Sequence, residues 1–582
     1  EKDPAGWRNT TLEERHRIMF EAANRLGDMR GDLIGSMCAV TGKTVVEGDV
    51  EVSEGIDYAR FYTATMKKFA AQHDVDITSK GTILVISPWN FPCAIPIGGI
   101  VAGLAGGNTV ILKPATVAAP VAWLFAKAFW DAGVPKEALQ VIITDREALK
   151  ELTTAPAIKH IILTGGTDTA QSIARTNPST PLSAETGGKN AIILTASGDR
   201  DHAIMNIVAS AFGNAGQKCS ACSLLLVERS VYEDKNFQDK LKDAATSMKV
   251  GSVWEAGNVV GPMITNRNDK LLQALTLEPG ESWLVPPKFI DEKQYILAPT
   301  VKWGVKPDSY SFRTELFGPM LSVACIDNLQ QGIELVNSLD YGLTSGLQSL
   351  DENEQKLWKD SILAGNLYIN RGITGAIVNR QPFGGMKLSA FGGGVKAGGP
   401  NYCACLVKIT DKPESNTDYK QSYPHAYEEE FAHARDINKL YGEQNAFRYL
   451  PLKNMVLRLF PGDSNEEAEM IALAAKLCHT PLTISFDPND DRTTALSSTG
   501  CTLKKETLDE FLKTMRTYER IRTCGADIPM EMYEEAARRN KYIATAKPVK
   551  NGRVELIHYI KEQSISFEYH RYGSILDVPP VE

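Results

Sequence analysis

Short apolar runs alternate with amphipathic segments along most of this 582-residue chain. Residues 110–112, 161–163 and 191–194 are short apolar runs typical of strands, and a segment with helical spacing follows each one. Residues 10–72 have helical spacing before the first of these strands. Strand–helix alternation of this kind predicts an α/β fold built on a doubly wound parallel sheet.

Residues 82–112 contain no charged side chain, and this stretch is long enough to cross a bilayer. Pro88, Pro92 and Pro96 interrupt it, and Gly106-Gly107-Asn108 is typical of a helix end. We therefore predict a buried strand–helix–strand unit of the sheet and no membrane span.

The composition, 43% hydrophobic and 23% charged, excludes a disordered or fibrous chain. A net charge of -8 argues against a nucleic-acid partner. Ten cysteines are too few for a disulfide scaffold, and the N-terminus shows no signal peptide. These features favour a cytoplasmic protein that acts on a small molecule.

The segment 411–450 is polar at its start and lacks an apolar period, so we predict a linker there. Strand-like runs return at 455–460 and 482–486, which predicts a smaller C-terminal α/β domain over 451–582. This domain contains neither a second nucleophile context nor a glycine turn suited to phosphate. We expect it to have no chemistry of its own and to serve in docking or covering.

Seven short motifs follow one another in the first 390 residues. They are Pro88-Trp89-Asn90-Phe91-Pro92, Lys113-Pro114-Ala115, Thr164-Gly165-Gly166-Thr167, Glu185-Thr186-Gly187-Gly188-Lys189-Asn190, Gly216-Gln217-Lys218-Cys219-Ser220, Glu315-Leu316-Phe317-Gly318-Pro319 and Gln381-Pro382-Phe383-Gly384-Gly385. Each alone is weak: Cys219 could be a core cysteine or half of a metal or redox pair with Cys222, and Glu185 a surface residue.

In this order and spacing the motifs resemble the aldehyde dehydrogenase superfamily from about residue 6 to 410. The resemblance implies an α/β aldehyde dehydrogenase fold with a Rossmann-like NAD domain and an α/β catalytic domain. The implied divisions are 1–187 (NAD domain, fold N-terminus truncated, oligomerisation segment near 61–79), 188–388 (catalytic domain), 389–410 (return to the NAD domain and flap strand), 411–450 (linker) and 451–582 (degenerate dehydrogenase-like domain).

The resemblance also assigns roles. It implies that Cys219 is the nucleophile, Glu185 the general base and Asn90 the oxyanion donor. The implied NAD-binding residues are Ser87, Pro88, Trp89, Lys113, Gly165, Gly166, Thr167, Glu315 and Phe317, and no metal is implied. Many relatives have an acidic residue just after the Lys-Pro motif, whereas Thr116 and Val117 stand here, so NADP stays open as a cofactor.

A narrower resemblance, to the Δ1-pyrroline-5-carboxylate dehydrogenase branch, lies in Gly365–Arg371, Thr374-Gly375-Ala376 and Lys396–Tyr402. That branch oxidises L-glutamate γ-semialdehyde to L-glutamate. The resemblance implies that Ser220, Gly375 and Ala376 hold the substrate α-carboxylate and that Phe383 and Phe212 wall its aliphatic chain. Succinate semialdehyde dehydrogenase and an inactive scaffold are the alternatives.

Three runs in the last third of the chain resemble the longer, bifunctional proline utilization A proteins. They are Gly442-Glu443-Gln444-Asn445, Gly552-Arg553-Val554-Glu555-Leu556 and Glu562-Gln563-Ser564-Ile565-Ser566. This resemblance implies a proline dehydrogenase domain or partner upstream. It also implies FAD only on that upstream part, with no FAD site in this chain, and a homo-oligomer.

Overall fold

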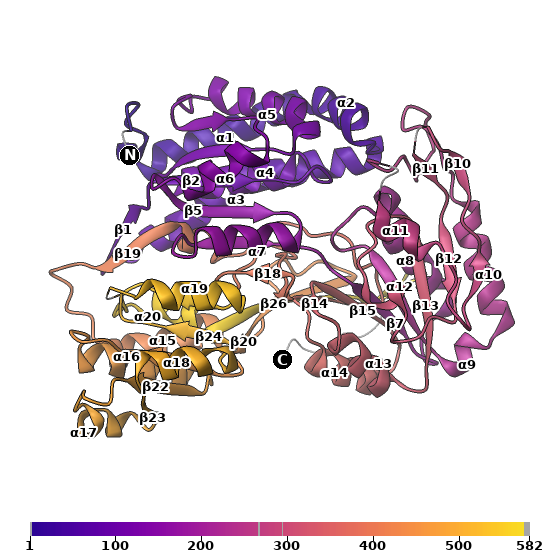
Figure 1. The fold of residues 1–582 in the computed structure, drawn as a ribbon. Helices are drawn as coiled ribbons and strands as arrows, with labels where there is room; N and C mark the ends of the chain where they lie inside the picture. The colour runs from indigo at the N-terminus through magenta and orange to yellow at the C-terminus, as the bar shows by residue number, and fades with distance from the viewer. Residues whose placement is uncertain (1–2, 266–267, 294, 526, 576–582) are drawn as a thin grey trace.

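Three mainly parallel sheets organise the chain into three α/β bodies, shown in Figure 1. The computed structural model describes residues 3–265, 268–293, 295–525 and 527–575. In that view the N-terminal body lies at the upper left, the second at the right and the third at the lower left. The predicted α/β fold is confirmed.

The first body has a six-stranded sheet in the order β18-β6-β5-β2-β3-β4. Its strands are β2 (Thr82–Ile86), β3 (Thr109–Lys113), β4 (Leu139–Val141), β5 (Ile158–Thr164), β6 (Leu182–Glu185) and β18 (Ala390–Phe391). Its helices are α1 (Leu12–Asp28), α2 (Arg30–Thr41), α3 (Val45–Ala70), α4 (Ala94–Ala105), α5 (Ala119–Asp131), α6 (Arg146–Thr154) and α7 (Thr167–Thr176).

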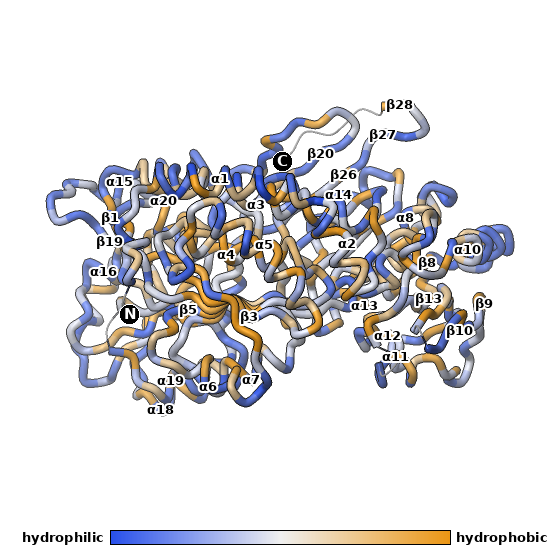
Figure 2. Tube along the Cα trace, turned by 90° about the horizontal axis from the view of Figure 1, so that it is seen from above, coloured by the Kyte–Doolittle hydropathy of each residue, from blue (hydrophilic) through white to orange (hydrophobic). Residues whose placement is uncertain are grey.

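The uncharged stretch 82–112 forms the centre of this body as β2, α4 and β3. Helix α4 lies directly on the sheet because two of its glycines leave no room for a side chain. A Cβ at Gly99 would meet Val85 at 2.9 Å, and one at Gly103 would meet Val110 at 2.8 Å. Figure 2 shows the apolar strands β3 and β5 running through the interior. No helix in the described part of the chain has the length and apolar character needed to span a membrane.

The second body has a nine-stranded sheet in the order β20-β26-β16-β15-β7-β8-β13-β12-β9, antiparallel only at its two outer pairs. Its strands are β7 (Asn190–Leu194), β8 (Cys222–Glu228), β9 (Ser282–Val285), β12 (Thr300–Trp303), β13 (Met320–Ile326), β15 (Thr344–Gln348), β16 (Asn366–Ile369), β20 (Glu443–Pro451) and β26 (Ile560–Glu568). Its main helices are α8 (Arg200–Phe212), α10 (Lys235–Ser247), α11 (Asp269–Ala274), α13 (Leu329–Asn337) and α14 (Glu352–Ser361).

The third body has a parallel five-stranded sheet in the order β23-β22-β21-β24-β25. Its strands are β21 (Met455–Arg458), β22 (Leu482–Phe486), β23 (Thr502–Lys505), β24 (Arg520–Arg522) and β25 (Tyr542–Ala544), and its main helices are α16 (Asn465–Leu477), α18 (Leu508–Thr514) and α19 (Met530–Arg538). Helix α19 packs against α7 of the first body, as Figure 1 shows.

The prediction of a linker over 411–450 is wrong. This segment contains α15 (Tyr419–Ala426) and β20, and β20 pairs with β26 from Glu443↔Glu568 to Pro451↔Ile560. Strand β26 in turn pairs in parallel with β16. The C-terminal segment therefore completes the edge of the second sheet. Local periodicity did not reveal this because the partner strand lies more than 100 residues away.

The predicted flap strand pairs inside this chain. Strand β19 (Val407–Asp411) runs antiparallel to β1 (Val75–Ser79), with Ile409 opposite Ile77. Residues 402–406, directly before this strand, form a 3₁₀ turn.

Candidate active site

Cys219 lies between a 3₁₀ turn at Gly213–Gly216 and the first residue of β8. Asn214, Ala215 and Gly216 have φ values of 52°, 53° and 69°, so three left-handed residues precede the cysteine loop. A Cβ at Gly216 would lie 2.2 Å from the Gly318 carbonyl oxygen, which only glycine allows. Such backbone strain costs energy and persists only where the surrounding packing enforces it. The loop is therefore held rigidly, and the Cys219 side chain stays partly exposed.

Asn190 fixes the loop from the other side. Its Nδ2 donates to the Cys219 carbonyl oxygen at 2.6 Å and to the Ala221 carbonyl oxygen at 3.0 Å. A Cβ at Gly188 would lie 2.7 Å from the Cys219 oxygen, so glycine is required beside the nucleophile. This accounts physically for the Gly-Gly-Lys-Asn part of the fourth motif.

Asn90 reaches the same loop from the first body. Its buried Nδ2 donates to the Gln217 carbonyl oxygen at 3.1 Å, which leaves the second amide N–H for another acceptor. Glu51 of α3 holds the segment after Asn90, because its Oε1 accepts from Cys93 N at 2.7 Å and Ala94 N at 3.1 Å. Rigid donors beside a nucleophile are what a developing oxyanion requires.

Glu185 ends β6 and faces the loop that follows β16. Gly385 N donates to Glu185 Oε2 at 2.9 Å. Burial raises the pKa of this carboxyl above its usual range, while Lys396 and the Gly385 N–H oppose the rise. A carboxylate whose pKa is raised is a stronger base, which suits it to take a proton from water.

Burial, followed by the nearby carboxylates of Glu315 and Glu185, raises the pKa of the Cys219 thiol to about 12. The thiol is therefore protonated at neutral pH in the protein alone. A cationic group bound next to Glu315 would oppose this effect.

Seven of the nine expected cofactor residues lie at the carboxyl ends of β2, β3 and β5, where doubly wound folds bind dinucleotides. Burial lowers the pKa of Lys113 at the end of β3. Gly166 caps α7 without a side-chain hydrogen bond, so the N–H groups of this helix start can meet a phosphate. The buried Ser87 Oγ has no hydrogen-bond partner among the described residues, as expected if a ligand supplies one.

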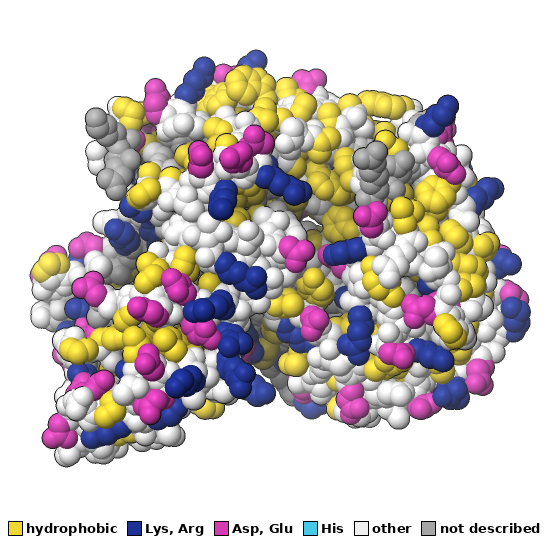
Figure 3. Space-filling view, in the orientation of Figure 1, with side chains coloured by type: hydrophobic (Ala, Val, Ile, Leu, Met, Phe, Trp, Pro, Cys, Tyr) yellow, Lys and Arg dark blue, Asp and Glu magenta, His cyan; other side chains and the backbone are white. Residues whose placement is uncertain are grey.

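The other wall of this region comes from the second body. Glu315 Oε1 accepts from Gly188 N at 2.8 Å, and the Phe317 ring meets the Trp89 ring edge-on with centroids 5.8 Å apart. Figure 3 shows the surface hollowed between the first and second bodies. The arrangement fits a dinucleotide with its phosphates at α7 and its far end near Cys219.

Gly375 and Ala376 lie in the loop after β16, and Ser220 directly follows Cys219. Gly375 has a φ of 134° and open space where a side chain would be, so its backbone can face a ligand. Phe383 anchors the neighbouring segment through two backbone hydrogen bonds with Ala397, of 2.8 and 2.9 Å.

Phe212 ends α8, directly before the turn that leads to Cys219, but it is fully buried. It is 0% exposed and belongs to the hydrophobic core of the second body. The expectation that it walls the substrate chain is therefore not supported. A buried aromatic at the end of a helix gives the same sequence signal in a core as in a pocket.

Four charged residues that surround the site were not predicted as site residues: Glu51, Lys396, Glu443 and Glu562. Glu443 accepts from Arg371 Nη1 at 2.9 Å and Arg380 Nη1 at 3.0 Å, at the two ends of the Gly375 loop. Lys396 and Asn401 lie in the quoted Lys396–Tyr402 run, but nothing local to that run indicates a partner on β26. Most of the residues that these four charged side chains contact lie far from them in the sequence, so no local motif connects the partners.

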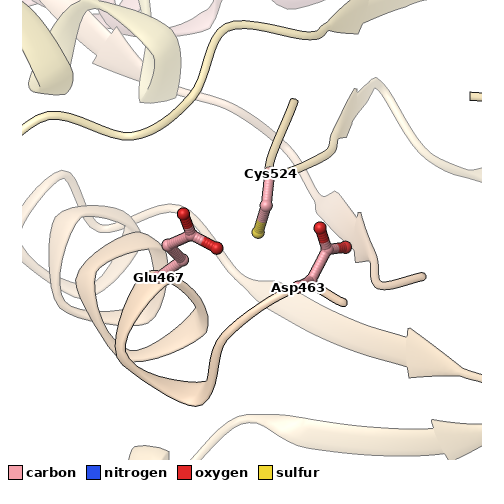
Figure 4. A group of neighbouring side chains, drawn as sticks. All are labelled: Asp463, Glu467 and Cys524. Carbon is pink, nitrogen blue, oxygen red and sulfur yellow. The ribbon is translucent and has the colours of Figure 1, made fainter. Parts of the chain in front are cut away.

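The strand order of the third body reverses between β21 and β24, the position at which open α/β sheets bind ligands. Asp463, Glu467 and Cys524 stand there with ligand atoms within 4.8 Å of one another (Figure 4). Both carboxylates are already bound: Phe460 N donates to Asp463 at 2.8 Å, and Lys547 pairs with Glu467 at 3.0 Å. Acidic side chains at the start of α16 repel a phosphate, which argues against a second dinucleotide site.

Comparison with known proteins agrees with this geometry. Residues 1–410 match the family described as "Aldehyde dehydrogenase family". The chain therefore belongs to the aldehyde dehydrogenase family.

Within that family, several curated relatives are named 1-pyrroline-5-carboxylate dehydrogenase. The Geobacillus sp. (strain WCH70) enzyme is 33% identical over 419 residues, which cover 68% of this chain and 80% of the relative. The Bacillus subtilis (strain 168) enzyme is 31% identical over 417 residues, covering 68% and 80%.

Two solved structures extend the comparison. Proline utilization A (PutA) from Corynebacterium freiburgense superposes with a TM-score of 0.87 at 37% identity, over 98% of this chain and 59% of that one. This chain thus spans less than two thirds of that protein. The 1-pyrroline-5-carboxylate dehydrogenase from Thermus with bound NAD gives a TM-score of 0.66 at 31% identity, over 70% and 82%.

Proposed function

We propose that this chain oxidises L-glutamate γ-semialdehyde to L-glutamate with NAD, the second step of proline catabolism. The observation that carries the chemistry is that Asn90 is bonded to the rigid loop that contains Cys219, and that the Glu185 carboxyl lies near enough to act on the Cys219 thiol. The substrate assignment is supported by relatives named 1-pyrroline-5-carboxylate dehydrogenase that the chain covers over 80% of their length.

In the proposed first step the Cys219 thiol releases its proton to solvent, and the thiolate adds to the aldehyde carbon and forms a thiohemiacetal. The oxyanion would accept hydrogen bonds from the remaining Asn90 amide N–H and from the Cys219 backbone N–H. NAD, when bound, supplies the acceptor for the hydride that leaves the carbonyl carbon, which makes a thioester. Lys113, the start of α7 at Gly165, Gly166 and Thr167, and Glu315 would hold it, with Ser87, Pro88, Trp89 and Phe317 lining the crevice.

Glu185 would then take a proton from the water that attacks the thioester, which releases the acid and restores the thiol. Its place at the end of β6, fixed by Gly385 N, supports this role. Ser220 and the backbone of Gly375 and Ala376 would bind the substrate α-carboxylate, and Phe383 would contact its methylene chain. Loops with exposed N–H groups bind anions in this way.

The test is a comparison of kcat/KM for glutamate semialdehyde, succinate semialdehyde and propanal, each with NAD and with NADP. The proposal expects glutamate semialdehyde with NAD to be preferred by about tenfold or more, since a site built for a charged group discriminates by at least that factor. Cys219→Ala serves as the blank. Preference for succinate semialdehyde would support the alternative substrate and overturn this one.

We further propose that the preceding oxidation of proline takes place on a separate domain or partner that carries FAD. The likeness to PutA over 98% of this chain, including its C-terminal segment, supports this arrangement. The purified chain should then show no flavin absorbance, and added proline should yield NADH only when a proline dehydrogenase is supplied.

A further inference from the structure

A single buried lysine lies between the proposed general base and the C-terminal segment. Lys396 is 1% exposed and follows β18, whereas Glu185 ends β6 and Glu562 lies on β26. Burial of a cation is costly unless anions and hydrogen bonds compensate for the lost hydration. The groups that compensate therefore indicate what Lys396 does.

On one side Lys396 faces the turn that holds Glu185. Its Nζ donates to Asn366 Oδ1 at 2.8 Å and to the Gly384 carbonyl oxygen. The next residue, Gly385, donates its N–H to Glu185. A Cβ at Gly384 would lie 3.1 Å from Glu185 Oε1 and 3.2 Å from Lys396 Cγ, so the two side chains flank one glycine. The lysine charge thus acts on the carboxyl of Glu185 at short range.

On the other side Lys396 faces Glu562, which is 2% exposed. Glu562 Oε2 accepts from Lys396 N at 2.6 Å, and Oε1 accepts from Asn401 Nδ2 at 2.7 Å. Arg553 Nη2 donates to Asn401 Oδ1 at 2.7 Å and holds that amide in place. Both carboxylate oxygens are therefore bonded, and the carboxylate is fixed beside the lysine.

We propose that Glu562 is a positioning residue for the general base: its charge keeps Lys396 protonated, and the Lys396 charge keeps Glu185 ionised. The inference rests on the proposed role of Glu185 in thioester hydrolysis. It assigns the C-terminal segment a part in catalysis, because β26 places the Glu562 carboxylate next to Lys396, whose charge acts on Glu185.

Apart from Glu54, the remaining titratable groups around the three have pKa values far from neutrality. Tyr58 of α3 and Tyr402 face Glu185, and their pKa values lie well above the usual range because they are buried. Cys219, also near Glu185, has its pKa raised to about 12. Glu562 faces Tyr449, Cys405 and Arg553, of which the first two have raised pKa values. Burial raises the pKa of Glu54, which lies beyond Tyr58, to about 8, so its titration is a background common to all variants.

The sign of the effect follows from these contacts. Burial lowers the pKa of Lys396, and both Glu185 and Glu562 oppose this. Removing the Glu562 charge makes Lys396 lose its proton more easily, and Glu185 then holds its own proton to higher pH. Direct repulsion between the two carboxylates would act in the opposite direction. It is the weaker effect because the charge that acts on Glu185 is that of Lys396 and not that of Glu562.

The experiment follows the pH dependence of acyl-enzyme hydrolysis with p-nitrophenyl acetate, which acylates a thiol without any cofactor or aldehyde. The variants are Glu562→Gln, Lys396→Met and the double variant. Lys396→Met should move the acid limb of the pH profile of the deacylation rate to higher pH by about one pH unit or more. A nearby opposite charge changes the pKa of a carboxyl by that amount. Glu562→Gln should move it in the same direction by about half a unit. The double variant should match Lys396→Met alone.

Ser564→Ala is the matched control, because Ser564 lies on the same face of β26 and its buried Oγ donates to the Pro382 carbonyl oxygen at 2.6 Å. It should leave the acid limb in place. An unchanged limb in Glu562→Gln, a shift to lower pH, or additive shifts in the double variant would overturn the proposal. Glu562→Gln alone decides the question if Lys396→Met does not fold. The readout is independent of the aldehyde, so failure of the substrate assignment would not affect it.

Discussion

Arg371 Nη1 lies 2.9 Å from Glu443 Oε2, so a strand of the C-terminal segment holds one end of the loop that contains Gly375. Arg380, at the other end, pairs with the second oxygen of the same carboxylate at 3.0 Å. One glutamate thus spans the loop proposed to bind the substrate α-carboxylate. The three side chains are 18–29% exposed, so the pairs are only partly screened by solvent.

The first prediction concerns that glutamate. Glu443→Gln should raise KM for glutamate semialdehyde by roughly 5- to 30-fold, because weakening two charge-assisted hydrogen bonds costs about 1–2 kcal/mol of loop order. Turnover of propanal, which lacks the carboxylate, should change less than twofold by the same reasoning. Steady-state kinetics measure both, with the exposed Glu429→Gln as control. Equal effects on the two aldehydes would show that Glu443 supports the whole fold.

The second prediction concerns Ser220. Ser220→Ala should raise KM for glutamate semialdehyde by roughly 10- to 150-fold, the range for one hydrogen bond to a charged group. Propanal oxidation should be nearly unchanged. If both substrates suffer alike, Ser220 acts on the neighbouring nucleophile and the carboxylate is bound elsewhere.

The third prediction uses the pKa of Cys219, raised to about 12 by burial, Glu315 and Glu185. Alkylation of the cofactor-free protein by iodoacetamide should rise about tenfold per pH unit without a plateau below about pH 10, because only the thiolate reacts. Glu315→Gln removes a negative charge, so it should lower this pKa and speed alkylation at pH 9. Cys222→Ala is the control. A plateau near pH 8 would contradict the electrostatic environment described here.

The fourth prediction concerns residues 411–582. Truncation after Thr410 should give an aggregated or insoluble protein, because it removes β20 and β26 and leaves the β16 edge unpaired. It also exposes the core around Leu367 that Ile565 and Phe567 cover. Gel filtration and NAD binding would show this, with truncation after Ile575 as control. A monodisperse truncated protein with normal activity would mean that the segment only docks, as the sequence suggested.

The sequence predicted the elements whose signal is local. The buried strand–helix–strand unit at 82–112 and the loops that carry Asn90, Glu185 and Cys219 lie where motif and period indicated. The sequence did not predict pairings between distant residues. Nothing in 411–450 indicates that β20 joins the second sheet, and no pattern connects Lys396 with Glu562. Phe212 was misjudged because burial in a core and exposure to a pocket leave the same apolar residue in the sequence.

The most direct measurement of the central claim is a rapid-mixing experiment on Glu185→Gln with glutamate semialdehyde and NAD. With Cys219 intact and no base for water, the account predicts one NADH per active site in a burst, then slow turnover. Mass spectrometry should then find one glutamyl group on the peptide that contains Cys219. Wild-type turnover without a burst, or no adduct on Cys219, would contradict the account.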